Sequence, residues 1–492
     1  MGKTYILVVA GILIAKMLGF FRDIVFASVF GASAYTDMYF QIFGLVNLLF
    51  TGIGVALSTL VIKNINKIKA DNKKAQKEYV SCFITKTVII SSFVMLALYL
   101  VSGHLVRILL PGLDVHFYNT ASTLMHIMLP SLVFVLVAYV ISGVLQNTGA
   151  FFITSIVSLP FNIAIIGSLM FENINIVAVS IVTTLGWFLH ILIQLPSFYK
   201  KGFRLFTFNL KSSAYGGNGE IIYIFISNMM FQLLFTIDKA FASIEKGAAS
   251  TLNYSSNLFI TISSIFVVAM SNVIFPSISR FYEENKMDYV KNLVQYIIKM
   301  MFAIFIPFIL VVCCFGKNII SLLYERGEFT PQLTSTTATL FAIYTFGFLG
   351  YICQELFNKV LYLDGKYKYT VAGSMAVVIS KPFINIIAIA FGGVYALAIS
   401  TTSLLCIYAV NVFIALKKVM GSYINKELIL DLAKILASSA ASLLVFFVIK
   451  AFLPIFAEGK LSFVVGIAVC GAIYLSLLHI FGVLKKLLKY RK

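Results

Sequence analysis

Residues 6–30, ILVVAGILIAKMLGFFRDIVFASVF, form the first apolar segment of the chain, and two opposite charges, Arg22 and Asp23, lie inside it. A membrane-spanning helix needs about 20 mainly apolar residues, so a helix over this stretch would carry both charges at membrane depth. A lone arginine at the bilayer centre costs at least about 2.5 to 3.5 kcal/mol, so it usually faces a partner or a wet cavity. Arg22 is therefore a candidate binding residue.

Composition extends this picture to the whole chain. The mean hydropathy is +0.97, with 60% apolar and 12% charged residues. These values exclude a soluble multidomain enzyme and predict an all-α polytopic membrane protein. The longest polar stretches, 63–79 and 200–220, are too short to fold as catalytic domains.

Windows of about 20 residues predict fourteen transmembrane helices. They begin near Thr4, Ala34, Tyr79, Ser122, Ala150, Ile174, Glu220, Ser250, Tyr289, Thr334, Tyr367, Gly393, Glu427 and Leu461. With the N-terminus inside, 25 basic residues fall in cytoplasmic segments and five on the opposite side. This bias predicts that both termini are cytoplasmic. The basic loops suit anionic membrane lipids, and their distribution argues against a nucleic-acid partner.

Eight basic residues remain at membrane depth or near its edges. Lys16, Arg22, Lys239 and Lys381 are the ones that snorkelling toward the surface does not readily explain. The six cysteines and five histidines show no metal-ligand spacing, and the 19 acids are scattered. We therefore expect no enzyme activity, no cofactor and no metal site.

Two halves of the chain resemble each other at an offset of about 215 residues. Asp23–Ser28 (DIVFAS) matches Asp238–Ser243 (DKAFAS), and further similarities follow in the same order. Two six-helix lobes of this kind would enclose a central cavity and rock between inward and outward states. We expect an N-lobe at 1–200, a cytoplasmic linker at 201–219, a C-lobe at 220–420 and two additional spans at 421–492.

Two motifs resemble a known family. Lys16–Asp23 (KMLGFFRD), followed by Phe26–Ala32 and Asp37, resembles the N-terminal signature of MurJ/MviN-type lipid II flippases, and Leu322–Thr330 resembles their loop before the tenth span. These flippases belong to the multidrug/oligosaccharidyl-lipid/polysaccharide exporter superfamily. The similarity covers nearly the whole chain.

The resemblance implies a monomeric transporter of the bacterial inner membrane. It would move an undecaprenyl-pyrophosphate-linked glycolipid from the cytoplasmic to the outer leaflet, with a groove for the polyprenyl tail formed by the last two helices. Lys16, Arg22 and Asp23 would line the cavity. The family's further arginines in the second and eighth spans are absent, and the eighth span offers Asn257 as a polar contact.

Each of these residues also has a structural interpretation. Arg22 and Asp23 could form an ion pair that locks a helix break at Gly19. Asp37 could begin the second span in contact with outside water, or line a gate. The resemblance assigns ion coupling to Asp238, Lys381, Asn385 and Thr401. An ammonium beside Asp238 opposes sodium, so we predict an Asp238–Lys381 pair and sodium-independent transport. The alternative is that Lys381 snorkels toward the cytoplasm.

Two other functions compete with lipid II transport. One is export of another polyprenyl-linked glycan, such as a capsule, teichoic or O-unit type, which the reduced set of arginines favours. The other is cation-coupled drug antiport, which would need about twelve spans and an acid-rich cavity.

Overall fold

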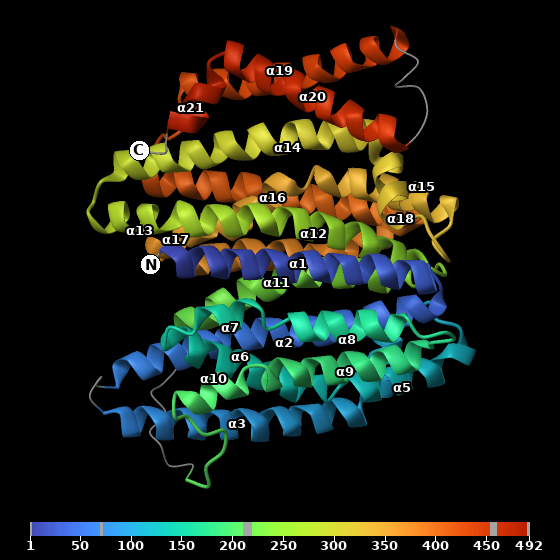
Figure 1. Ribbon diagram of the computed structural model, residues 1–492, viewed down its shortest axis with the longest axis vertical. Coiled ribbons are helices and arrows are strands. Elements are labelled where there is room, and N and C mark those ends of the chain that lie inside the picture. The colour runs from blue at the N-terminus through green and yellow to red at the C-terminus, as the bar shows by residue number, and fades with distance from the viewer. Residues whose placement is uncertain (1, 69–71, 210–218, 453–459, 490–492) are drawn as a thin grey trace. The chain divides into compact units, whose positions relative to one another are not determined.

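The computed structural model describes residues 2–68, 72–209, 219–452 and 460–489, and all regular structure within them is helical (Figure 1). Among these residues, eight helices are long and apolar enough to cross a membrane, or nine if the bent pair Pro331–Thr345 and Phe348–Leu363 is one span. The predicted all-α class and polytopic membrane character are confirmed. The number of fourteen spans stays a prediction.

The chain divides into two compact units. The N-terminal unit comprises Met1–Tyr254, Arg326–Phe329 and Ser374–Leu397. The C-terminal unit comprises Ser255–Glu325, Thr330–Gly373 and Ala398–Lys492. Each unit therefore contains segments that are far apart in the sequence.

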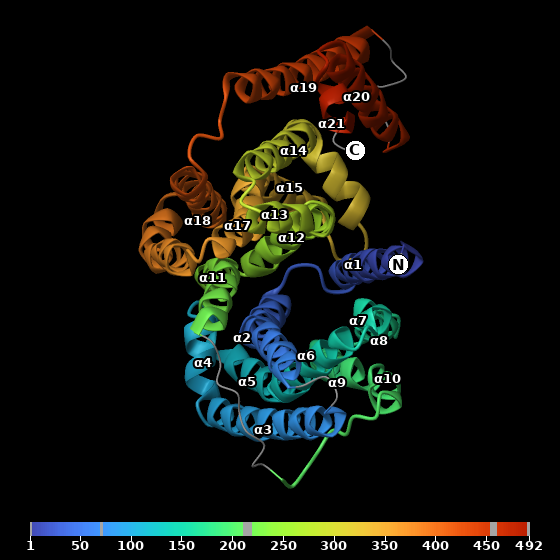
Figure 2. The ribbon, with the colours of Figure 1, turned by 90° about the vertical axis from the view of Figure 1, so that its left-hand side faces the viewer.

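The helices of the N-terminal unit are α1 (Gly2–Phe30), α2 (Ala34–Lys67), α3 (Lys73–Leu100), α4 (Ser102–Leu109), η1 (Val115–Phe117), α5 (Tyr118–Met128), α6 (Ser131–Asn147), α7 (Phe151–Ser155), α8 (Leu159–Leu169), α9 (Ile176–Leu192), α10 (Leu195–Lys200) and α11 (Gly219–Ala242). The long helices run roughly side by side in Figure 1, whereas the short α4 stands across α3 in Figure 2.

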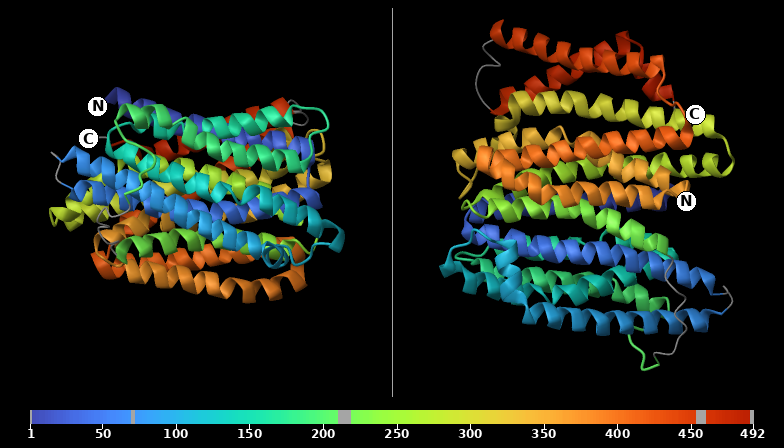
Figure 3. Two further views of the ribbon diagram at one scale, coloured as in Figure 1. Left: turned by 90° about the horizontal axis from the view of Figure 1, so that it is seen from below. Right: turned by 180° about the vertical axis from the view of Figure 1, so that it is seen from behind.

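Most later helices belong to the C-terminal unit (Figure 3). They are α13 (Phe275–Glu283), α14 (Met287–Tyr324), α15 (Pro331–Thr345), α16 (Phe348–Ile352), η2 (Cys353–Phe357), α17 (Asn358–Leu363), α19 (Lys426–Phe452), α20 (Lys460–Ile480) and α21 (Val483–Lys489). Helices α12 (Ala248–Val273) and α18 (Tyr367–Met420) contribute to both units.

Two glycine positions test the predicted helix breaks. The expected break at Gly19 is wrong, because α1 is uninterrupted from Gly2 to Phe30. A single glycine costs a helix only about 1 kcal/mol, which the surrounding apolar residues tolerate. Helix α18 does leave helical geometry at Gly392 and Gly393, where the latter has φ +54°. This kink coincides with the predicted start of a new span at Gly393.

The core of the N-terminal unit lies where α2, α3, α6 and α9 meet. Val61 of α2, Ile84 of α3 and Ile141 of α6 are fully buried there. Close approach of α2 and α6 depends on Gly143, where an added Cβ would lie 2.6 Å from Ser58 Oγ and 2.9 Å from Ser58 O. The unit's scaffold is therefore sensitive to side-chain size at this crossing.

We expect Gly143→Leu to lower the free energy of unfolding by about 1 to 3 kcal/mol, because the new side chain must push α2 and α6 apart. Thermal unfolding of the purified protein in detergent measures this effect. Gly167→Ala is the matched control, since no atom lies within 4 Å of a Cβ at that helical position. Equal melting temperatures for the two variants would contradict the expectation.

Candidate functional site

Arg22 and Asp23 form an ion pair on α1. Arg22 Nη2 lies 2.6 Å from Asp23 Oδ1, and Arg22 Nε donates to the same oxygen at 3.0 Å. The two side chains are 17% and 11% exposed. Because an ion pair hydrogen-bonded by two nitrogens neutralises both charges, α1 can hold them within an apolar environment.

Helix α8 completes the surroundings of the Arg22 guanidinium. Arg22 Nη1 donates to Asn162 Oδ1 at 3.1 Å, and Asn162 Nδ2 donates to Ser158 O at 3.0 Å. The guanidinium carbon lies 5.5 Å from the ring centre of Phe161 and 6.0 Å from that of Phe43. Arg22 is thus fixed by an acid, an amide and aromatic faces, a combination that suits a guanidinium.

Lys16 lies six residues before Arg22 and lines a cavity of about 560 Å³. The wall is formed by residues of α1, α2, α6, α7, α9 and the segment that enters α8, all of the N-terminal unit. Lys16 is half-buried. Lys16 therefore lines an open cavity whose described wall residues belong to one unit.

Asp37 is buried against the first turn of α12. Its Oδ2 accepts from Gly247 N at 2.7 Å, and its Oδ1 accepts from Ser250 N at 2.6 Å and from Ser250 Oγ at 2.5 Å. A carboxylate is favourable here because helix N-terminal N–H groups carry partial positive charge. Asp37 is 3% exposed, so the expected contact with outside water is wrong. The N-cap of α2 is Ser33.

The segment Arg326–Phe329 contacts the C-terminal end of α1. Glu328 N donates to Ser28 O at 2.9 Å. Gly327 (φ +55°) and Gly31 (φ +57°) have left-handed backbone. A Cβ at Gly327 would collide with Ser28 O, and a Cβ at Gly31 would collide with Glu328 O. The two motifs that carry the family resemblance thus meet in space. Sequence reasoning missed this contact, since nothing local indicates a partner about 300 residues away.

Asp238, Lys381 and Asn385 form one buried cluster. Lys381 Nζ lies 2.5 Å from Asp238 Oδ1, and Asn385 Nδ2 donates to the same oxygen at 2.8 Å. None of the three is more than 1% exposed. The predicted Asp238–Lys381 ion pair is confirmed, and snorkelling of Lys381 is contradicted by its burial.

The remaining expected site residues belong to the C-terminal unit. Thr401 is fully buried in that unit, and Asn257 is half-buried there. Within the described parts of the chain, no group of three or more His, Cys, Asp or Glu side chains is placed to hold a metal ion.

Lys239 is a further buried cation of the N-terminal unit. It is 8% exposed, and its Nζ donates to Asn253 Oδ1 at 2.8 Å. The sequence showed that a lysine at membrane depth is unusual, but it did not indicate a partner for Lys239. Asn253 is uncharged, so nothing in the sequence identified it as that partner. Lys239 was therefore absent from the expected site residues.

Comparisons of this sequence with a family model and with curated proteins identify the same family. The sequence model of the family described as "Lipid II flippase MurJ" matches residues 26–467. The chain is 26% identical over 375 residues to the probable lipid II flippase MurJ of Buchnera aphidicola subsp. Schizaphis graminum, covering 71% of this chain and 70% of the relative. It is 24% identical over 424 residues to the lipid II flippase MurJ of Burkholderia cenocepacia, covering 82% of each.

Solved structures share the fold. Lipid II flippase MurJ in an inward closed conformation matches with a TM-score of 0.81 at 21% identity, covering 97% of this chain and 98% of that one. An inward-facing multidrug resistance MATE family transporter matches with a TM-score of 0.62 at 13% identity, covering 83% and 95%.

We expect Asp37→Ala to accelerate amide hydrogen exchange at the first turn of α12 by about tenfold or more, because bonds to a charged group contribute about 1.5 to 3 kcal/mol. Hydrogen exchange mass spectrometry of peptides covering Gly247 and Ser250 measures this change. Ser250→Ala, which removes one of the three bonds to Asp37, should have a smaller effect. Unchanged exchange in Asp37→Ala would show that the carboxylate does not hold this turn.

Proposed function

Because this chain belongs to the lipid II flippase MurJ family, we propose that it moves the undecaprenyl-pyrophosphate-linked peptidoglycan precursor from the inner to the outer leaflet by alternating access. The observation that carries the proposal is the mostly buried guanidinium of Arg22. It lies within an apolar helix and is held by Asp23 and Asn162. A pyrophosphate needs such a cation at membrane depth. The relatives are flippases, which agrees with a transporter and not an enzyme.

The proposed architecture has fourteen transmembrane helices. Residues 1–200 would form an N-lobe, 201–219 a cytoplasmic linker, 220–420 a C-lobe and 421–492 two further spans with a basic tail. Most of the proposed linker, 210–218, lies outside the described residues. The excess of basic residues in the proposed cytoplasmic segments supports cytoplasmic termini. We propose a monomer of the inner membrane whose basic loops contact anionic lipids.

In this proposal Arg22 is the principal pyrophosphate contact, with Lys16, Asp23 and Asn257 in supporting positions. Asp23 and a pyrophosphate are both anions and compete for one guanidinium. Substrate binding would then exchange one ion pair for another, which costs less than exposing an unpaired charge. Release would restore the Arg22–Asp23 pair.

The Asp37 clamp on α12 is proposed as a gate. It joins α2 to the turn at Gly247 and Ser250 through three short hydrogen bonds. The contact of Glu328 with Ser28 lies at the end of α1, only a short turn before α2. Opening toward the outside would require these bonds to be exchanged for water.

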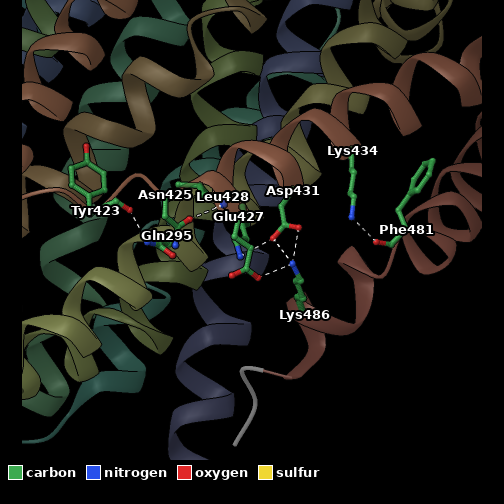
Figure 4. Close-up of polar contacts among 10 residues, drawn as sticks. Gln295, Tyr423, Asn425, Glu427, Leu428, Asp431, Lys434, Phe481 and Lys486 are labelled. Atoms are coloured by element: carbon green, nitrogen blue, oxygen red, sulfur yellow. Dashed lines mark hydrogen bonds and ion pairs between the residues drawn. The ribbon is translucent and has the colours of Figure 1, made fainter.

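The C-terminal helices are proposed to hold the polyprenyl tail. Asp431 of α19 accepts from Lys299 of α14 at 2.9 Å. Lys486 of α21 donates to Asp431 at 2.9 Å and to Glu427 at 2.8 Å (Figure 4). Farther along, α14, α19 and α20 enclose a groove of about 500 Å³ whose lining is mainly apolar, including Phe308, Leu443 and Ile467. An isoprenoid chain suits such a lining.

We expect wild-type protein to restore growth of a strain depleted of its own lipid II flippase, and Arg22→Ala to fail despite equal membrane levels. Arg22→Lys should rescue partially, because an ammonium retains charge without the bidentate fork. Colony formation and immunoblots of membranes provide the measurements. Lack of rescue by well-expressed wild type would favour another polyprenyl-linked glycan as substrate. Full rescue by Arg22→Ala would refute the assigned role of Arg22.

We expect replacement of external sodium by choline to leave the flipping rate unchanged. Lys381 places an ammonium on Asp238, at a position where a sodium ion would need a carboxylate with surplus negative charge. Flipping of fluorescent lipid II in proteoliposomes, with both salts at equal ionic strength, tests this. A large loss of rate in choline would contradict the proposed role of the pair.

A further inference from the structure

The groove between α14, α19 and α20 occupies only one end of the apolar part of α14. Residues 300–316 carry no charge and lie between Lys299 and Lys317. An uncharged stretch of this kind marks the part of a helix inside the hydrocarbon layer. The groove-lining residues of α14 begin at Pro307, near the middle of this stretch, and continue to Leu323. In the proposed topology the groove therefore lies toward the outer side of the membrane.

The inner part of the same helices is filled by side chains. We call this cluster the inner core; its buried members are Ala303, Ile435, Tyr474, Leu478, Val483 and Leu487. Ala303 on α14 and Ile435 on α19 each lie one turn before the first groove residue of their helix, Pro307 and Ser439. Close-packed side chains leave no room for a lipid chain. A polyprenyl tail can therefore extend into the inner part only if this core opens.

Tyr474 of α20 lies at the boundary, because it belongs to both the groove and the inner core. Its hydroxyl donates to Ala303 O at 2.7 Å. That carbonyl is available because Pro307, four residues later in α14, has no N–H for the usual helix hydrogen bond. The proline thus leaves an acceptor on α14, and the tyrosine binds it from α20. This bond holds the two helices together at the inner end of the groove.

Helix α21 completes the inner core from the cytoplasmic side of the proposed topology. Val483 and Leu487 are 0% and 9% exposed within that core. Tyr296 of α14 donates its hydroxyl proton to Leu487 O at 3.1 Å. Gly482, between α20 and α21, has φ +72°, a backbone conformation that glycine adopts without strain. The chain can therefore turn there and bring α21 back over the inner ends of α14 and α19.

An ionic contact joins α21 to α19. Lys486 donates to Asp431 at 2.9 Å and to Glu427 at 2.8 Å (Figure 4). The side chains of Lys486 and Glu427 are 40% and 62% exposed. Ion pairs that reach solvent contribute little to stability. This contact can therefore hold α21 in its docked position and still release it readily.

Release of α21 does not leave a buried charge without a partner. Asp431 is 1% exposed and also binds Lys299 of α14, at 2.9 Å. When Lys486 moves away, Lys299 still neutralises the carboxylate. An unpaired buried carboxylate would be strongly destabilising. The second lysine therefore makes reversible undocking of α21 feasible.

We propose that α21 is a latch for the polyprenyl tail. Docked α21 keeps the inner core closed, and its release lets the tail pass Tyr474 and extend from the groove into the inner part of the membrane. The inference rests on the proposed flippase function and its tail groove. Since a substrate taken from the inner leaflet carries its tail there, the closed core must open during loading.

The latch couples two equilibria. If the tail binds better when α21 is undocked, then tail binding must promote undocking, and undocking must strengthen tail binding to the same extent. The docked form lowers the apparent affinity for the tail in proportion to its population. Both directions of this coupling can be measured.

Hydrogen exchange mass spectrometry tests the first direction. The full-length protein in nanodiscs is compared with and without undecaprenol, a neutral probe that has the tail and no charged head. We expect undecaprenol to accelerate exchange at least about threefold in peptides covering Val483–Lys489. Slower or unchanged exchange there, in protein that binds undecaprenol, would overturn the proposal.

Substitutions test the second direction, with native mass spectrometry giving the midpoint of undecaprenol binding. Lys486→Gln removes the contact with Asp431 and Glu427, while Lys299 keeps Asp431 paired. We expect its midpoint to be about threefold to tenfold lower than that of the wild type. Lys485→Gln is the matched control, because it makes the same change of charge at an exposed neighbour outside this contact. Its midpoint should not change.

A milder variant keeps the test available if Lys486→Gln does not fold. Glu427→Gln removes only the more exposed partner of Lys486 and should lower the undecaprenol midpoint about twofold. Because undecaprenol has no charge, none of these changes can be the loss of a contact with a charged headgroup. A higher or unchanged midpoint in Lys486→Gln, or an equal decrease in Lys485→Gln, would overturn the proposal.

Flipping of fluorescent lipid II in proteoliposomes separates the latch from the transport function. Flipping by wild-type protein whose α21 exchange does not respond to undecaprenol would retain transport and overturn the latch. Accelerated exchange in α21 without flipping would retain the latch and refute the proposed transport. No binding of undecaprenol would overturn the tail groove and the latch together.

Discussion

A charge within a membrane protein needs a partner supplied by the protein, and this requirement determines how the N-terminal unit is built. Arg22 pairs with its neighbour on α1, and Lys381 reaches Asp238 on another helix. Asp37 is compensated by the backbone N–H groups at the start of α12. The Lys381–Asp238 and Asp37 contacts join segments that hydrophobic packing alone would leave free to slide, and Arg22 joins α1 to α8 through its hydrogen bond to Asn162.

The sequence was most predictive where charges are rare. The family resemblance assigned Asp238 and Lys381 to one group of positions, and their opposite charges then predicted an ion pair before their helices were placed. The all-α class followed from hydropathy, since helices satisfy the backbone within one segment. Neither conclusion needed the details of packing.

Where partners are neutral or backbone groups, the sequence was much less predictive. The burial of Asp37 depends on a helix that starts about 210 residues later, and its acceptor role could not be read from the sequence around it. Continuity of α1 through Gly19 depends on tertiary packing that outweighs a weak local preference.

The Lys381–Asp238 pair and the Arg22–Asp23 pair differ in how easily they can change partners. Lys381 and Asp238 are almost completely buried, and breaking such a pair by removing one partner costs about 3 to 5 kcal/mol. The ammonium is part of the Lys381 side chain, so it cannot dissociate as a free cation could. The pair therefore holds its two helices together permanently. The Arg22 side chain retains 17% exposure, and its guanidinium lies over the ring of Phe161. Exchange of Asp23 for a substrate phosphate at Arg22 is therefore the least costly rearrangement, and we infer that substrate binding acts there first.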